Sequence, residues 1–139
     1  MATMTGYTDA HGLVVIPIQS AIQVSGTATV LGPIMTFVGE VVGASISSVA
    51  NSIADDGSNK FVIDVTVNAN VAFSFDTNTT DLKLETKALT ENSTAANKRF
   101  AVGEQLKVVF TETGTAVNLN PGTTVWVTVF PGYDYAGEV

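Results

Sequence analysis

Very few residues of this chain have side chains that could carry out chemistry. His11 is the only histidine among 139 residues, and there is no cysteine. A Ser-His-Asp triad needs a histidine held beside a serine and an acid, and no G-x-S-x-G segment places a serine on a strained turn. We interpret His11 as a solvated residue near the N-terminus. The sequence therefore predicts no catalytic residues, no cofactor and no enzyme activity.

The segment from Asp76 to Asp81 is the best candidate for a metal site. Asp76, Asn78 and Asp81 offer oxygen ligands at a spacing that resembles part of a calcium loop. The segment lacks the central glycine and the terminal bidentate glutamate of such loops. Because Asp and Asn also dominate ordinary turns, a plain turn is the preferred interpretation, and calcium is the alternative. Residues 55–59 are interpreted as a turn for the same reason.

The charge balance excludes one class of partner. The chain carries 13 Asp and Glu against 6 Lys and Arg, which gives a net charge of −7. Only Lys98 and Arg99 are adjacent basic residues, so there is no basic stripe of the kind that binds phosphates, and no nucleic-acid partner is expected. We interpret the acidic balance as favouring solubility and repulsion between monomers. Complementarity to a basic partner surface is the alternative.

Neither a membrane span nor a secretory signal is expected. The longest apolar run, residues 13–18, is far shorter than the roughly 20 residues that cross a bilayer. The first nine residues lack a basic region followed by an apolar stretch. The 13 carboxylates could include a glycosidase pair, but one Trp and three Tyr offer few platforms for a sugar, and we do not expect this activity.

Composition and periodicity predict strands. Val, Ile and Thr make up 46 of the 139 residues, and these β-branched residues suit a pleated surface. Every odd position from Phe61 to Phe75 is apolar, which is the strand period. Such a strand would be long, so we expect a bend or bulge near residues 68–70 to divide it.

Other segments add further strands, among them residues 82–89, which we expect to form one strand. We expect residues 105–130 to form a three-strand meander with a short strand at 116–119, and Pro17 indicates that residues 13–19 form an edge or a bulge. A strand is favoured for residues 44–54, with a short helix as the alternative. The fold class we predict is all-β, an antiparallel β-sandwich or jelly roll of about eight strands. Its predicted core residues are Phe61, Ile63, Val65, Phe73, Val108, Phe110, Val125 and Val127.

Four aromatic residues near the C-terminus are candidates for an interaction site. Trp126 and Phe130 share one face of a predicted strand, either as core or as a subunit contact, where Trp and Phe are enriched. Tyr133 and Tyr135 follow the last strand, and their segment either docks on a neighbouring subunit or folds back on its own domain.

The layout divides the chain into an N-terminal arm at residues 1–12, a β-sandwich domain at 13–130 and a C-terminal arm at 131–139. A small, acidic, cysteine-free, Thr-rich β domain between two arms resembles the bacteriophage capsid decoration proteins in composition and layout. The resemblance implies a virion structural protein that is made in the host cytoplasm and binds the outer surface of a capsid. Its implied partners are the major capsid protein and copies of itself, with a trimer favoured. The alternatives are a β-sandwich carbohydrate-binding module and a tail or fibre subunit.

Overall fold

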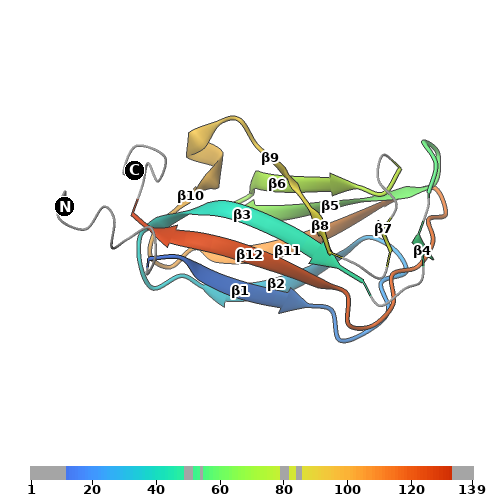
Figure 1. The fold of residues 1–139 in the computed structure, drawn as a ribbon, viewed down its shortest axis with the longest axis horizontal. Helices are drawn as coiled ribbons and strands as arrows, with labels where there is room; N and C mark the ends of the chain where they lie inside the picture. Colours follow the sequence, from blue (N-terminus) through green and yellow to red (C-terminus); the bar gives the residue numbers. More distant parts are fainter. Residues whose placement is uncertain (1–11, 49–51, 54, 79–81, 84–85, 133–139) are drawn as a thin grey trace.

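The fold is an all-β sandwich of two antiparallel sheets with five strands each (Figure 1). The structure is a computed structural model that describes residues 12–48, 52–53, 55–78, 82–83 and 86–132. The fold class predicted from composition and alternation is therefore confirmed, with about ten strands in place of about eight.

Strands that follow one another along the chain mostly belong to different sheets, with the β5–β6 hairpin as an exception. The first sheet consists of β1 (Val14–Gln19), β12 (Thr124–Pro131), β3 (Gly39–Ser47) and β10 (Arg99–Phe100) in that order, with β8 (Thr86–Ala88) also on β3. The second sheet has the order β2 (Ala28–Ile34), β11 (Gln105–Thr113), β5 (Lys60–Val67), β6 (Asn70–Asp76) and β9 (Thr90–Glu91). A separate pair is formed by β4 (Ser52–Ile53) and β7 (Leu82–Lys83), and a 3-10 turn, η2 (Ala95–Lys98), precedes β10.

The strand pairs are nested inside one another. Strand β1 pairs with β12, β2 with β11, β3 with β10, and β5 with β6, all antiparallel. This is the order that results when one long hairpin of paired strands is rolled into two sheets, so the sandwich has the strand order of a jelly roll.

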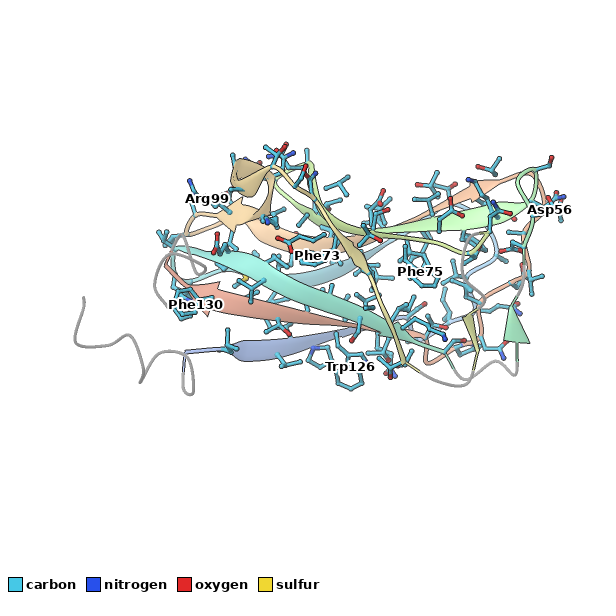
Figure 2. All side chains as sticks on the ribbon, turned by 45° about the horizontal axis from the view of Figure 1, so that its top comes forward. Asp56, Phe73, Phe75, Arg99, Trp126 and Phe130 are labelled. Atoms are coloured by element: carbon cyan, nitrogen blue, oxygen red, sulfur yellow. The ribbon has the colours of Figure 1, made fainter. Side chains whose placement is uncertain are left out.

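The core lies between the sheets. All eight residues predicted for it are buried, and Figure 2 shows Phe73 and Phe75 between the two layers. Along β5 every second residue is buried, from Phe61 to Val67. The period-two pattern therefore identified the inner face correctly.

The break expected near residues 68–70 is a tight hairpin. Asn68 and Ala69 both have positive φ, at 47° and 67°, as a two-residue turn matched to the twist of its strands requires. Just before this turn, the β5–β6 ladder has a bulge between Val65 and Thr66. The chain therefore reverses here, whereas a bend would have let it continue in one direction.

Two sequence-based predictions of strand arrangement are wrong. Strands β11 and β12 belong to different sheets, so residues 105–130 form no meander, and Leu119 makes only an isolated bridge to Val24. Both strands bury every second, apolar residue. This alternation predicts which face of a strand is buried, but it does not predict which strand pairs with it. Residues 82–89 were expected to form one strand, but β7 and β8 belong to different sheets.

Two other predictions hold. Strand β1, which contains Pro17, is an edge strand of its sheet. Within residues 44–54, the described parts are the end of β3 and the short β4, so the strand interpretation is confirmed there over the helix.

Candidate interaction surface

The outer side of the first sheet carries an exposed tryptophan. Trp126 lies in the middle of β12, opposite Pro17 of β1 and Ser45 of β3. Its neighbours Val125 and Val127 point into the core and are fully buried, so the indole must point outward. The side chain is 39% exposed, and Figure 2 shows it on the outside of the sheet.

Two rows of outward-facing positions across four strands and one across three make up this surface, which we call the Trp126 face; all of them are at least partly exposed except Thr124, at 4%. Each row is set by the register of β1, β12, β3 and β8. The rows are Gln19, Thr124, Ser47 and Thr86; then Pro17, Trp126, Ser45 and Ala88; then Val15, Thr128 and Gly43. None of these eleven residues carries a charge, and most are small. The indole is the one large aromatic ring on this face, whose other side chains are mostly short and are all uncharged.

Phe130 lies on the same side of β12 as Trp126 but is not accessible. Alternation along the strand places the two residues on one face, as predicted. Phe130 is only 3% exposed and lies outside the main core cluster. It is paired with Glu40, whose Oε2 lies 4.0 Å from Arg99 Nε. Of the two aromatic residues, only Trp126 is therefore available to a partner. Tyr133 and Tyr135, like His11, lie outside the described residues.

The calcium candidates have other partners. Asp76 Oδ2 accepts a hydrogen bond from Lys60 Nζ at 2.8 Å, and its Oδ1 accepts one from the backbone N–H of Asn78. Burial acts to raise the pKa of Asp76, but these hydrogen bonds outweigh it and hold the pKa below its ordinary value. Asp81 lies outside the described residues. The described part of the chain contains no cluster of three His, Asp or Glu residues suited to a metal.

In the turn at residues 55–59, the carboxylates of Asp55 and Asp56 are also occupied by hydrogen bonds within the protein. Asp55 accepts hydrogen bonds from the hydroxyl of the buried Thr77 and, at 3.0 Å, from the N–H of Val117. Asp56 accepts the N–H groups of Ser58 and Asn59, both at 2.8 Å, which lowers its pKa. The predicted turn at residues 55–59 is confirmed, and its carboxylates hold loops together at the end of the sandwich opposite Phe130 (Figure 2).

Both terminal segments are attached at one end of the Trp126 face. The described chain starts at Gly12 and ends at Gly132. Because Val14 pairs with Val129, the start of β1 lies beside the end of β12 (Figure 1). Gly132 N–H donates to the carbonyl of Val38 at 2.9 Å, which fixes the exit point. Both predicted arms are therefore joined to the sandwich at neighbouring points.

A second surface was missed by sequence reasoning. A groove of about 530 Å³ is lined by residues 19–31, which connect β1 to β2 at one open side of the sandwich. Ile22 in its wall is 75% exposed. The sequence feature that could have predicted this groove is a lack of charge, since residues 10–39 contain no Asp, Glu, Lys or Arg.

Comparison with protein-family models, curated proteins and solved structures finds no match to this chain. No helix among the described residues is long and apolar enough to cross a membrane.

Proposed function

We propose that this protein is a structural component of a virus particle, a decoration protein that binds the outer surface of a bacteriophage capsid. The observation that carries the proposal is the open, uncharged Trp126 face on a sandwich with jelly-roll strand order. Jelly rolls are common among viral capsid and lectin domains. Fold alone does not assign a function, so the features of the Trp126 face have to support it.

The composition of the Trp126 face suits contact with another protein. The centres of protein interfaces are depleted in charged residues and enriched in aromatic ones, and a central Trp is a frequent source of most of the binding energy. Small neighbours such as Gly43 and Ser45 leave the indole as the most prominent group. A capsid surface with a pocket for one ring fits this arrangement.

The attachment of both arms at one end of the same face supports the proposal further. The predicted arms, residues 1–12 and 131–139, join the sandwich at neighbouring points. Segments that order on binding add contact area at an entropic cost. In this proposal the sandwich supplies a rigid face, and the arms extend the contact to the capsid or to a sister subunit of a trimer.

The test uses virions purified from cells that carry the gene. Mass spectrometry of those particles should find the chain in a fixed ratio to the major capsid protein. After mild denaturant strips the chain, added full-length protein should sediment with the particles, whereas Trp126→Ala should not. Val102→Ala, which shortens an even more exposed apolar side chain outside the Trp126 face, is the matched control and should rebind normally.

A carbohydrate-binding module is the second candidate. An indole with an apolar face and a polar edge, flanked by the amide of Gln19 and the hydroxyls of Ser45 and Thr128, would also suit a sugar ring. A glycan array separates the two candidates. Binding that Trp126→Ala abolishes, together with absence from virions, would replace the capsid proposal by this one.

A further inference from the structure

The strands β1 and β2 and the connection between them form one complete side of the sandwich, residues 14–34, which we call the β1–β2 side. Strand β1 is the edge of the first sheet and β2 is the edge of the second. They are in contact through Ile18, whose Cδ1 would lie 2.7 Å from a Cβ added at Gly32. Any larger residue at position 32 would clash, so the glycine allows the two edges to close on each other.

The β1–β2 side, residues 14–34, carries five of the exposed apolar side chains, and two more lie just outside it at Leu13 and Val38. Ten large hydrophobic residues of the described chain are exposed, and seven of them fall between Leu13 and Val38. Those seven are Leu13, Val14, Val15, Ile22, Leu31, Ile34 and Val38. Single exposed apolar residues are normal, but a concentration on one side marks an interaction site.

Hydrogen bonds fix the backbone that lines the groove on this side. Val24 exchanges two backbone hydrogen bonds with Leu119, at 2.8 and 3.0 Å. Ser20 N–H donates to Thr123, and the Ser20 hydroxyl donates to the carbonyl of Ile22 at 2.7 Å. The connection from β1 to β2 is therefore held against the loop before β12, and its apolar groups are presented outward by a fixed backbone.

Residues 14–34 carry no charge of their own in an otherwise acidic protein, and their charged neighbours come from β11. Lys107 is the ladder partner of Leu31, and Glu112 Oε2 lies 3.7 Å from where a Cβ at Gly26 would be. Residues 10–39 contain none of the 19 Asp, Glu, Lys and Arg residues, while the chain carries a net charge of −7. Natural edge strands are usually protected by charged side chains, and here only Pro17 and Pro33 interrupt the two edges. These edges are left open to another chain.

We infer that the β1–β2 side is the surface through which copies of this chain bind one another. Copies with a net charge of −7 repel, and contact through a side whose own residues carry no charge lowers that repulsion at short range. A basic partner would instead be bound by the acidic remainder of the surface. The side has two unlike edges, so β1 of one copy can meet β2 of the next, the kind of contact that closes into a ring.

The inference rests on the proposed function, because a decoration protein that forms a ring can bind one capsid through several Trp126 faces at once. The two surfaces are separable by mutation, because Leu31 and Ile22 are not part of the Trp126 face. Failure of one proposal can therefore be distinguished from failure of the other.

The test is sedimentation velocity of the full chain from micromolar to millimolar concentration. We expect a defined oligomer, which should strengthen with added salt because salt screens the repulsion between acidic copies. Leu31 is 63% exposed, so Leu31→Glu and Leu31→Lys should fold and should both raise the dissociation concentration at least tenfold. Ile22→Glu should act in the same way, and circular dichroism and melting confirm folding of each variant.

The matched controls are Ala96→Glu and Ala96→Lys, in η2 near the opposite edge of the sandwich, where Ala96 is exposed. They change the net charge by the same amounts as the Leu31 variants and should shift the dissociation concentration less than twofold. A full chain that stays monomeric throughout, or equal effects at positions 31 and 96, would overturn the inference. A monomer that still sediments with virions would overturn it while leaving the capsid proposal intact.

Discussion

The indole Nε1 of Trp126 on β12 donates a hydrogen bond of 3.0 Å to the Oγ of Ser47 on β3. Ser47 lies one row away from Ser45, the direct partner of Trp126, so the bond holds the ring diagonally across the sheet. The polar edge of the indole is satisfied within the protein while its apolar surface stays accessible. A ring oriented in advance loses little further freedom when a partner covers it.

Trp126 is the only tryptophan in the chain, so its fluorescence reports directly on this face. In the free protein its emission should be that of a partly solvated indole. Addition of stripped virions should shift the emission to shorter wavelength, because the partner removes water from the ring. An unchanged spectrum in the presence of bound protein would place the contact elsewhere.

Removing the hydrogen bond tests the orientation of the ring. Ser47→Ala should leave the fold intact and weaken virion binding by several-fold, about 0.5–1.5 kcal/mol for one hydrogen bond. Trp126→Ala should weaken it by more than tenfold, as expected for a central aromatic residue. If Ser47→Ala matched Trp126→Ala, the serine would itself have to be a contact residue. Titration of stripped virions with each variant measures both effects.

The core prediction concerns Phe73, which is 4% exposed between the sheets. Phe73→Ala should reduce the free energy of unfolding by roughly 3–5 kcal/mol, since it removes a buried ring and leaves a cavity. Urea denaturation measures the change, with the exposed Val102→Ala as control, for which a change within about 0.5 kcal/mol is expected. A loss below about 1 kcal/mol for Phe73→Ala would mean that the ring is not enclosed.

Thr77 connects two loops through a buried hydroxyl. Its Oγ1 donates to Asp55 Oδ2 and accepts the N–H of Phe61 at 3.0 Å. Thr77→Val keeps the shape but leaves a backbone donor and a carboxylate without this partner, so it should cost about 1–3 kcal/mol in urea denaturation. Thr111→Val, the same change at an exposed position of β11, should be close to neutral. Equal effects at the two positions would refute the role assigned to Thr77.

Stability should fall in acid. The pKa values of Asp56 and Asp76 are held below the ordinary 3.8 by their hydrogen bonds, so the folded state favours the ionised forms. Their contribution is therefore present above about pH 4 and is lost as the pH falls through the lowered folded-state values. Urea midpoints for the intact protein should drop between pH 4 and pH 2. Asp76→Asn should show a smaller drop over that interval, and an identical drop would contradict the assignment.

The sequence predicted the fold class because alternation is a direct consequence of one-sided burial. From Phe61 to Phe75 it marked the inner face of what became β5 and β6. It could not identify strand partners, because β11 and β12 have similar patterns and lie in different sheets. Residues 22–30 also alternate, yet β2 begins only at Ala28, after a bridge at Val24 and a glycine at φ 148°. At these positions, contacts with the rest of the fold determine which residues form strand hydrogen bonds, and the local sequence pattern does not.

The candidate surfaces were predictable only in part. Both faces of β12 are apolar in sequence, so core and contact were equally consistent with Trp126, and the sheet register was needed to show it exposed. For the β1–β2 side, the absence of charged residues can be recognised in the sequence. Its meaning depends on the two edge strands lying side by side, which is a property of the fold.

Cosedimentation of the purified full-length chain with stripped virions tests whether the Trp126 face binds the capsid. We expect saturable binding at a fixed ratio to the major capsid protein, with Val102→Ala binding like the intact chain and Trp126→Ala left in the supernatant. A folded chain that remains in the supernatant at every concentration, or a Trp126→Ala variant that binds as tightly as the intact protein, would contradict the capsid proposal.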